Sequence, residues 1–281
     1  MPVSADAPLT RSIPSSGERI PVMGMGTWRV FDVGHGPSAR APLDRCVAAF
    51  ESLGGRVIDT SPMYGWAEEV AGEILTSLGL HDRMFIATKV WTQGRERGIE
   101  QMRESMRKLG VDRVDLMQVH NLVDASTHLD TLRRWKAEGL VRYIGVTHYS
   151  DRAHADVARV LRETPLDFVQ INYSVAERAA EQSILPLAAE RGVAVIANRP
   201  LAAGAALGPL RERPVPEWAA ELGCTTWSQL LLKFVVSHPA VTCAIPATSN
   251  PDHLLDNMRA ASGPMPDASL RERIARAATE R

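Results

Sequence analysis

The chain has 281 residues, 45% of them hydrophobic and 23% charged, and a formal net charge of -1. This length suits one large α/β domain or two small ones, and the near-neutral charge without a basic run gives no reason to expect a nucleic-acid or anionic-membrane partner. No apolar run is long enough to span a bilayer, and residues 1–10 lack the apolar core of a signal peptide, so we expect a cytoplasmic protein.

Cysteine usage gives no sign of a disulfide framework. The chain has 3 cysteines, Cys46, Cys224 and Cys243, which are far apart and form no Cys-x-x-Cys pair. An odd number of separated cysteines is typical of a reducing compartment. We therefore interpret these thiols as small buried hydrophobes.

Short apolar, β-branched runs alternate with helical apolar spacing along nearly the whole chain. In chain order we predict a hairpin over 11–21; strands over 22–26, 57–60, 85–90, 114–120, 143–148, 167–173, 193–197 and 241–245; helices over 37–52, 67–78, 99–109, 126–138, 152–162, 179–191, 226–236 and 250–260; and a last helix over 267–278. This even alternation, at a spacing of about 30 residues, is typical of parallel βαβ units. We predict an α/β fold: a (β/α)8 TIM barrel with an N-terminal β-hairpin and an extra C-terminal helix, as a single domain over 1–281. An open doubly wound sheet is the less favoured alternative.

Polar side chains end three consecutive strands of this predicted barrel. Asp59 closes the second strand, and Tyr64 follows in the loop after it. Lys89 lies near the end of the third strand, and His120 ends the fourth. Because the C-terminal strand ends of such barrels form the active face, we expect these four side chains to converge.

The chemistry of this set points to proton donation. A phenol has a pKa near ~10, and a buried ammonium beside it favours the phenolate and lowers that pKa. A buried lysine keeps its charge only when it is paired, and Asp59 is the nearest carboxylate by strand order. His120 can hydrogen-bond a substrate oxygen or relay a proton. Each residue alone has an ordinary structural interpretation, but together they favour a site that protonates an oxygen as negative charge develops on it.

Several motifs carry a family resemblance. They are Gly24-Met-Gly26-Thr27-Trp28, Ile58-Asp59-Thr60-Ser61-Pro62-Met63-Tyr64-Gly65, Ala87-Thr88-Lys89, Asp115-Leu-Met-Gln118-Val-His120, Ile144-Gly-Val-Thr147, Gln170-Ile-Asn-Tyr173 and Ile245-Pro246. On these motifs the chain resembles the aldo-keto reductases over nearly its whole length. The resemblance implies an NAD(P)H-dependent carbonyl reductase in which Tyr64 is the general acid, Lys89 and Asp59 tune it, and His120 orients and polarises the carbonyl. No metal and no covalent intermediate are implied.

The resemblance also implies which residues hold the nicotinamide. The family uses a Ser-Asn pair and a Gln for the carboxamide, and this chain has Thr147, His148 and Gln170 at those places. Asn198 stands where the family stacks an aromatic side chain. The remaining residues implied on this side of the cofactor are Gly26, Thr27, Trp28 and Asp59, with Arg199, Pro200, Leu201 and Gly204 for the diphosphate.

The adenosine end departs most from the family. Members that prefer NADPH place a Lys and an Arg where this chain has Ala247 and His253, so two cations for the 2′-phosphate are missing. Thr248, Ser249 and Asn250 before a helix N-terminus could still hold a phosphate. Asp256 and Asn257 match the family's adenine-binding pair. We expect NADP(H) as the first cofactor, with NAD as a possible second.

The substrate side is expected to be apolar and open. Trp28, Trp91 and Met63 would line the mouth of the pocket, and the resemblance adds Asn121. The chain ends soon after the predicted eighth helix, so we expect no long specificity loop and a broad range of small carbonyl substrates. A monomer is expected.

One alternative class stays open on the same fold. A non-catalytic module could bind a nicotinamide nucleotide and report its redox state to a partner. A barrel glycosidase is disfavoured because it needs two carboxyl groups flanking the bond, and Asp59 is the only carboxylate at the predicted strand ends.

Overall fold

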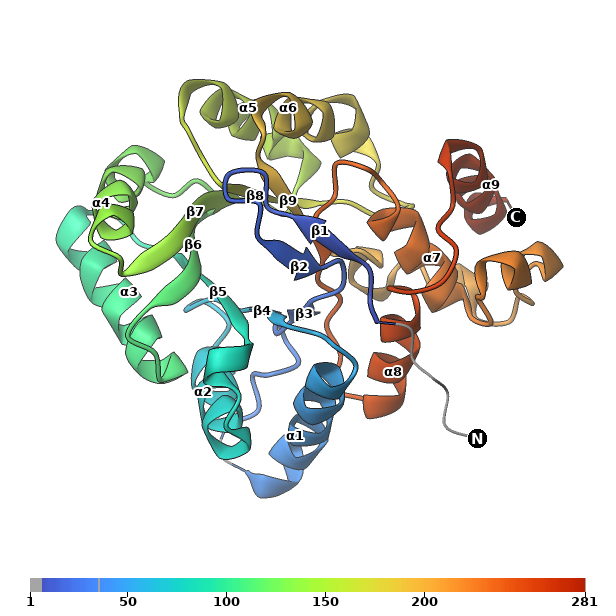
Figure 1. Cartoon of the computed structure of the whole chain (residues 1–281), viewed down its shortest axis with the longest axis horizontal. Coiled ribbons are helices and arrows are strands. Elements are labelled where there is room, and N and C mark those ends of the chain that lie inside the picture. Colours follow the sequence, from blue (N-terminus) through green and yellow to red (C-terminus); the bar gives the residue numbers. More distant parts are fainter. Residues whose placement is uncertain (1–6, 35, 281) are drawn as a thin grey trace.

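Eight parallel strands close into a barrel in the computed structural model, which describes residues 7–34 and 36–280 (Figure 1). The strands are β3 (Met25–Gly26), β4 (Val57–Asp59), β5 (Phe85–Val90), β6 (Val114–His120), β7 (Val141–Thr147), β8 (Phe168–Asn172), β9 (Ala194–Asn198) and β10 (Cys243–Ala244), each paired with the next. The sheet closes through a parallel bridge between Met23 and Ala244, where Gly24 N donates to Ala244 O at 2.8 Å. The predicted (β/α)8 barrel is confirmed.

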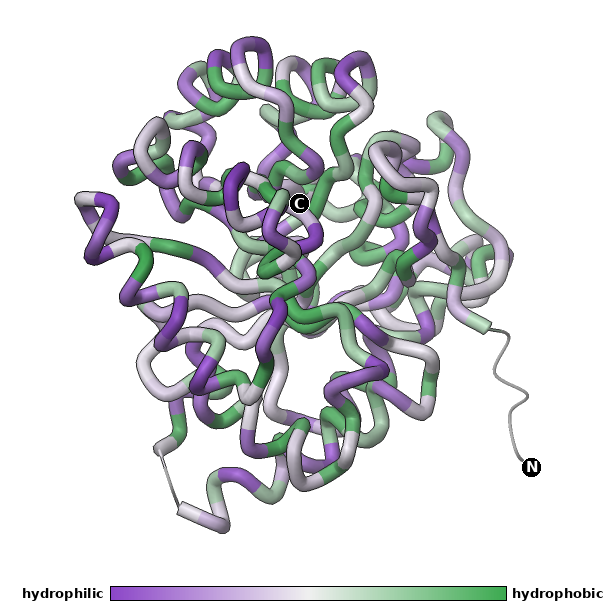
Figure 2. The backbone as a smooth tube through the Cα atoms, turned by 60° about the vertical axis from the view of Figure 1, so that its left-hand side comes forward, coloured by the Kyte–Doolittle hydropathy of each residue, from purple (hydrophilic) through white to green (hydrophobic). Residues whose placement is uncertain are grey.

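Helices surround the barrel on all sides (Figure 1). They are α1 (Pro37–Ser52), α2 (Ala67–Leu78), α3 (Arg95–Leu109), α4 (Ala125–Ala137), α5 (His154–Glu163), α6 (Ile184–Arg191), α7 (Trp227–Val236), α8 (Pro251–Arg259) and the extra C-terminal helix α9 (Ala268–Thr279). In Figure 2 hydrophobic residues run through the centre of the molecule, while hydrophilic ones are frequent on the outer helices. Between residues 7 and 280, no described helix combines the length and apolar character that crossing a membrane requires.

Some element boundaries differ from the prediction. The predicted helix 179–191 is divided into a 3-10 turn, η3 (Ala179–Gln182), and α6, because Ser183 has a non-helical backbone (φ -139, ψ -68) and Pro186 has no N–H to donate. Helix α3 begins at Arg95 rather than at residue 99, directly after Gly94. The first and last barrel strands shorten to two residues each, since a single bridge closes the sheet between them.

The predicted N-terminal hairpin closes one end of the barrel. Its strands β1 (Thr10–Ser12) and β2 (Arg19–Pro21) pair antiparallel, and the hairpin lies across the barrel in Figure 1. Ile13 and Ile20 are buried in one cluster with the side chains inside the barrel. The interior members of this cluster are Val57, Phe85, Ala87, Leu116, Tyr143, Phe168, Ala194, Ile196, Cys243 and Ile245. Side chains therefore fill the barrel interior, and the hairpin closes one end of it. A functional site can then lie at the opposite end.

The three cysteines are buried and unpaired, as predicted. Burial raises the pKa of the Cys46 and Cys224 thiols to about 11. These thiols therefore stay protonated at neutral pH.

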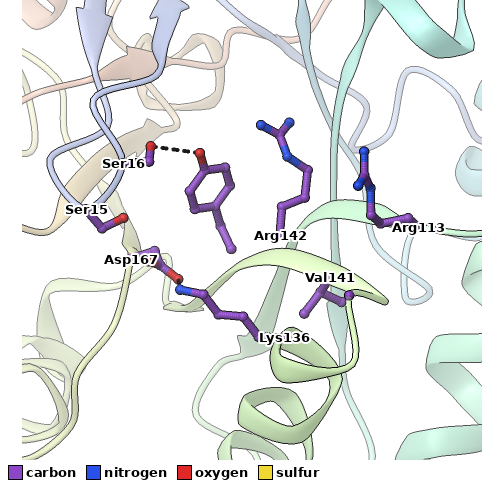
Figure 3. A pocket seen from close by; sticks show the side chains of 9 residues that line it. Ser15, Ser16, Arg113, Lys136, Val141, Arg142 and Asp167 are labelled. Carbon is purple, nitrogen blue, oxygen red and sulfur yellow. Dashed lines mark hydrogen bonds and ion pairs between the residues drawn. The ribbon is translucent and has the colours of Figure 1, made fainter.

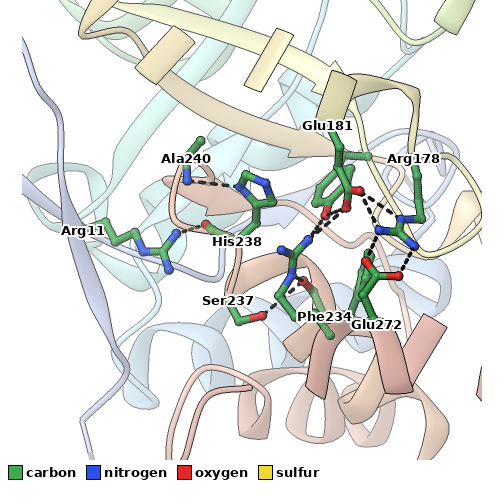
Figure 4. A network of polar contacts seen from close by, with 10 residues as sticks. Arg11, Arg178, Glu181, Phe234, Ser237, His238, Ala240 and Glu272 are labelled. Atoms are coloured by element: carbon green, nitrogen blue, oxygen red, sulfur yellow. Dashed lines mark hydrogen bonds and ion pairs between the residues drawn. The ribbon is translucent and has the colours of Figure 1, made fainter. Parts of the chain in front are cut away.

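A largely buried ionic network docks helix α9 (Figure 4). Arg271 lies 2.9 Å from Glu181 of η3, also contacts the hydroxyl of Tyr173, and donates through Nε to Phe234 O of α7 at 3.2 Å. Tyr173 donates to Glu181 at 2.5 Å, and Arg178 lies 2.7 Å from the same carboxylate. One arginine of α9 thus joins the C-terminal helix to two earlier parts of the chain.

Replacing Arg271 by Met should lower the free energy of unfolding by about 2 kcal/mol or more, because Glu181 and Tyr173 lose a charged partner in a poorly hydrated site. Urea denaturation followed by circular dichroism measures the change. Arg159→Met is the matched control, since Arg159 and its partner Asp156 are both exposed, and its effect should stay below about 1 kcal/mol. Equal effects of the two substitutions would contradict this view of the network.

Candidate active site

The four side chains predicted to converge lie together at the open end of the barrel. Asp59 and His120 are the last residues of β4 and β6, and Lys89 is the penultimate residue of β5. Lys89 Nζ lies 2.7 Å from Asp59 Oδ2 and 5.1 Å from the centroid of the Tyr64 ring. The Tyr64 and His120 rings meet edge to face, with centroids 5.8 Å apart. One acid, one cation, one phenol and one imidazole therefore share a single site.

The ion pair between Lys89 and Asp59 is shielded from water. The Lys89 side chain is fully buried, and its ammonium also donates to Thr60 O at 2.7 Å. Asp59 uses its other oxygen to accept from Gln170 Nε2 at 2.7 Å and, at 3.5 Å, from Gln118 Nε2. Burial lowers the pKa of Lys89, but the charges of Asp59 and Tyr64 outweigh it, so the pKa is raised above its ordinary value. The ammonium therefore stays charged at neutral pH.

The pKa of Tyr64 differs from our expectation. We expected the neighbouring ammonium to lower it, and Lys89 does act in that direction. Burial raises the pKa of Tyr64 more strongly, and the Asp59 carboxylate adds to that, so the pKa lies above its usual value in this structure. The expectation of a lowered pKa was wrong because it left out the desolvation of the phenol. Tyr64 keeps its proton at neutral pH.

His120 is a neutral imidazole. Burial, the Lys89 ammonium and His148 together lower the pKa of His120 to about 2. Its Nδ1 lies 3.0 Å from the hydroxyl of Ser61. Of the two roles that the sequence left open for His120, a hydrogen bond to a substrate oxygen fits this environment, and proton relay through an imidazolium does not.

A contact from a distant loop fixes the segment that carries Tyr64. Tyr64 N donates to Ser61 O at 3.0 Å in a turn, and Trp66 N, just before α2, donates to the Asp32 carboxylate at 3.0 Å. Gly65 has φ +61, and a Cβ there would collide with the same carboxylate. Sequence reasoning missed Asp32, because its partner is 34 residues away and no local pattern links the two.

Backbone strain concentrates at the same end of the barrel. Among the described residues, those with positive φ other than glycine are Arg29, Asn121, Leu122, Asp124, Arg199, Ala202 and Ala203. All of them lie in the loops that follow β3, β6 and β9. Side chains adopt this conformation at a cost, and such positions cluster at functional sites.

Two buried acceptors without a partner in the described chain lie near the end of β7. Asn198 Nδ2 donates to His148 O at 3.2 Å and Asn121 N donates to Thr147 O at 2.8 Å, while the Oδ1 atoms of both asparagines are unsatisfied. Buried polar atoms are normally hydrogen-bonded, so a ligand that brings N–H donors fits here. A carboxamide has two such donors, so the unsatisfied acceptor of Asn198 fits the nicotinamide predicted beside it, and that of Asn121 lies on a residue predicted for the substrate side.

The side chains predicted to hold the carboxamide already make hydrogen bonds within the chain. Gln170 donates to Asp59, and its Oε1 accepts from Thr147 Oγ1 at 2.8 Å. His148 accepts from the backbone N–H groups of Tyr149 and Ser150 through Nδ1, at 3.0 and 3.2 Å. In the neutral ring, the proton of His148 must then reside on Nε2. His148 can therefore still donate one hydrogen bond.

Comparisons with known proteins identify the family of this chain. A family model described as the aldo/keto reductase family matches residues 22–274. The chain belongs to that family. This family member is 29% identical over 245 residues to the methylglyoxal reductase YeaE of Escherichia coli, covering 85% of this chain and 84% of the relative. It is 28% identical over 227 residues to the NADH-specific methylglyoxal reductase of the same organism, covering 69% of this chain and 68% of the relative.

Solved structures of the family share the whole architecture. An aldo/keto reductase from Klebsiella pneumoniae in complex with NADP and acetate has a TM-score of 0.79 at 26% identity, covering 94% of each chain. An aldo-keto reductase from the same organism in complex with NADPH has a TM-score of 0.81 at 25% identity, covering 97% of each chain. The likeness extends over nearly the full length of this family member.

The loop predicted to hold the diphosphate carries an ion pair. Arg199, which was predicted to reach the diphosphate, donates to both oxygens of Glu177, at 2.9 and 3.3 Å, so its guanidinium is paired within the chain. Pro200 is buried, Leu201 is half-buried, and Gly204 has φ +90. A diphosphate would therefore meet the backbone of this segment rather than the Arg199 side chain.

The segment predicted to bind the adenosine end of the cofactor presents polar groups rather than cations. Ala247 and His253 are exposed. Thr248 Oγ1 accepts from Asn250 N at 3.1 Å, and Asn250 Oδ1 caps α8 by accepting from Asp252 N at 2.9 Å. These bonds order the start of α8, where backbone N–H groups attract anions.

The pair predicted to bind adenine makes contacts with α7. Asp256 accepts from Thr226 Oγ1 at 2.7 Å and from Gln229 Nε2 at 2.5 Å. Asn257 is buried, with its Oδ1 3.4 Å from the hydroxyl of Ser228. In this structure Asp256 therefore accepts hydrogen bonds from residues at the start of α7.

Exposed aromatic side chains surround the open end. Trp28 and Trp91, both predicted to line the substrate pocket, are 39% and 42% exposed. Met63 and Trp66 are exposed as well, and Tyr149 after β7 is a further aromatic that sequence reasoning missed. Thr27 joins this rim to the ion pair by donating through N and Oγ1 to Asp59 O, at 3.1 and 3.0 Å. Gly26 has no room for a side chain, since a Cβ would lie 2.9 Å from Ile245 O.

A separate hollow of about 410 Å³ lies at the hairpin end (Figure 3). Its lining residues come from the hairpin turn, the C-terminal end of α4, the residue before β6 and the starts of β7 and β8. Lys136 is paired with Asp167 at 2.6 Å, and Arg142 is paired with Asp115 at the same distance. Because the hollow is at the end of the barrel opposite to Lys89, it has no part in the candidate active site.

Replacing Lys89 by Met should lower the free energy of unfolding by about 3 kcal/mol or more, because Asp59 is left as a buried charge without a cation. Adding Asp59→Asn to Lys89→Met should recover part of this loss. Chemical denaturation of the four proteins in a double-mutant cycle measures the coupling. A double variant whose loss equals the sum of the two single losses would contradict it.

Proposed function

We propose that this protein reduces aldehydes or ketones to alcohols with a nicotinamide cofactor. The observation that carries the proposal is the buried pair of Lys89 and Asp59, 2.7 Å apart, in contact range of Tyr64 and beside His120. A fully buried ammonium has little structural use at the mouth of a barrel, but it favours a phenolate strongly where water is excluded.

The named relatives support the same reaction class. Two relatives from Escherichia coli are called methylglyoxal reductases, and one of these is called NADH-specific. The two Klebsiella pneumoniae structures are complexes with NADP or NADPH. Carbonyl reduction with NADPH or NADH is therefore the activity that we assign to this chain.

Tyr64 is the proton donor in this proposal. Its raised pKa keeps the phenol protonated before reaction, and the ammonium of Lys89 stabilises the phenolate once the proton has left. The nicotinamide, when bound, supplies a hydride to the carbonyl carbon. The Tyr64 proton goes to the carbonyl oxygen, so the product is an alcohol, and the phenolate regains a proton from water. His120 hydrogen-bonds the same oxygen as its charge develops.

The cofactor preference follows from the adenosine end. Ala247 and His253 stand where members that prefer NADPH place the two cations for the 2′-phosphate, so those two cations are absent. The polar start of α8 remains as a phosphate site that needs no cation. We propose NADP(H) as the cofactor with NAD(H) as a competent second, so the discrimination between them is small.

The exposed aromatic rim supports a carbonyl substrate with an apolar portion. Trp28 and Trp91 stand at the mouth, and Asn121 adds a buried acceptor beside it. Apolar walls with a few polar groups are the usual composition of small-molecule sites. Small aromatic aldehydes are thus suitable test substrates.

Tyr64→Phe should lower kcat for NADPH-dependent reduction of benzaldehyde by about a hundredfold or more, because the proton donor is lost. The dissociation constant for NADPH should change little, since the phenol oxygen is directed at the substrate. Steady-state kinetics and fluorescence titration measure the two quantities. Unchanged turnover would refute the assignment of Tyr64, while cofactor binding by the wild-type protein with no turnover of any carbonyl compound would favour a non-catalytic nucleotide-binding module.

Introducing the two missing cations should shift cofactor preference. The double variant Ala247→Lys and His253→Arg should tighten NADPH binding about tenfold or more relative to NADH, because charge-assisted bonds to the 2′-phosphate are added. Fluorescence titration of both cofactors with both proteins gives the ratio. Thr76→Ser on α2, far from α8, serves as the control variant. An unchanged ratio would mean that the 2′-phosphate does not lie near α8.

A further inference from the structure

Ser61 connects the two groups proposed to act on the substrate oxygen. Its hydroxyl lies 3.0 Å from His120 Nδ1, and its carbonyl accepts from Tyr64 N at 3.0 Å. The Ser61 side chain is fully buried, so water does not compete for the contact. One serine therefore touches the imidazole through its side chain and fixes the turn of the phenol through its backbone.

The surroundings of Ser61 favour one direction for its bond to His120. Ser61 Oγ also faces the backbone N–H of Met63 at 3.4 Å, and this group can only donate. A hydroxyl that accepts from a backbone N–H still has its own proton to give. Among the described residues, His120 Nδ1 is the one hydrogen-bond partner of this hydroxyl that can accept, so donation to Nδ1 is the arrangement that gives the buried hydroxyl proton a partner. In that arrangement Nδ1 is the acceptor nitrogen.

Because the His120 imidazole is neutral, the direction of this hydrogen bond decides which ring nitrogen carries the proton. A neutral imidazole carries one proton, and when Nδ1 is an acceptor that proton is on Nε2. Within the described chain, Nε2 has no hydrogen-bond partner, and it is not among the buried atoms that lack one, so it faces accessible space. The opposite tautomer would turn a lone pair toward the substrate oxygen, and two acceptors repel each other.

We propose that Ser61 is a positioning residue that holds His120 in the Nε2–H tautomer, so that the imidazole donates a hydrogen bond to the carbonyl oxygen of the substrate. The kinetic part of this inference rests on the proposed carbonyl reduction. The tautomer itself does not, because it follows from contacts within the chain.

The direct test is 15N NMR of histidine-labelled protein. The chemical shifts of the two ring nitrogens distinguish a protonated nitrogen from an acceptor nitrogen, and the His120→Gln variant assigns the signals. In the wild-type protein His120 should show a protonated Nε2 and an acceptor Nδ1 between pH 6 and 8. A protonated Nδ1 in the wild-type protein would overturn the proposal without any variant being made.

Ser61→Ala supplies the second test. The Nδ1–H tautomer of His120 should gain population, and kcat/KM for benzaldehyde should fall by about tenfold to a hundredfold, as is usual when a group that orients a functional histidine is removed. The dissociation constant for NADPH should stay within about twofold, because the hydrogen bonds of Ser61 go to His120 and to the turn, and Ser61 is not among the residues proposed to hold the cofactor. Unchanged tautomer and unchanged kcat/KM would overturn the proposal.

The matched control is Ser105→Ala. Ser105 is a buried serine on α3 whose hydroxyl bonds Glu68 at 3.1 Å, far from His120 in the fold. Its removal should leave the His120 signals unchanged, and a shift there equal to that in Ser61→Ala would mean that loss of any buried hydroxyl perturbs the ring. A protein that shows the Nε2–H tautomer but reduces no carbonyl compound would refute the proposed function and leave the tautomer assignment intact.

Discussion

The buried ion pair between Lys89 and Asp59 is the interaction on which the rest of the site depends. Each charge would be costly alone in the barrel, and each is tolerable because the other lies 2.7 Å away. Asp59 is further satisfied by Gln170, and the ammonium by Thr60 O. The pair thereby keeps a positive charge fixed beside the phenol of Tyr64 in a place that water does not screen.

The ammonium of this pair also affects the pKa values of Tyr64 and His120. Burial raises the pKa of Tyr64, and the Lys89 ammonium limits that rise, so the phenol is protonated at rest and its anion is stabilised after proton loss. Burial and the same ammonium lower the pKa of His120 to about 2, so the imidazole is neutral. An acid that holds its proton and a neutral donor beside it suit one oxygen that gains negative charge.

Backbone contacts of the surrounding loops hold this arrangement. Asp32 anchors the start of α2 through Trp66 N, and Ser61 O closes the turn at Tyr64. Residues with strained backbone lie in three loops at the same end of the barrel. The packed interior below, sealed by Ile13 and Ile20 of the hairpin, gives these loops a rigid base.

The sequence predicted the barrel well because its evidence is periodic. Eight apolar runs alternate with amphipathic segments, and the parallel pairing of strands then brings Asp59, Lys89 and His120 to one edge without further information. Short-range exceptions were harder to foresee. The helix predicted over 179–191 is divided at Ser183, whose non-helical backbone no periodic pattern reveals, with Pro186 contributing.

The sequence could not reveal which partners the polar side chains bond to within the chain. A motif places Gln170, Arg199 and Asp256 near the cofactor, but it does not say that they bond to Asp59, Glu177 and Thr226. The pKa of Tyr64 was misjudged for a related reason, since desolvation depends on how completely the phenol is covered and not on which residues are near it. Asp32 could not be found at all, because its contact exists only after the two loops have met.

The most direct measurement is the pKa of Tyr64 in the wild-type protein and in Lys89→Met. Tyrosine labelled with 13C at the ring carbon that carries the oxygen reports phenol ionisation by NMR, and Tyr64→Phe assigns the signal. If the ammonium of Lys89 stabilises the phenolate, the pKa of Tyr64 must be higher in Lys89→Met than in the wild-type protein. An equal or lower pKa in the variant would contradict the account.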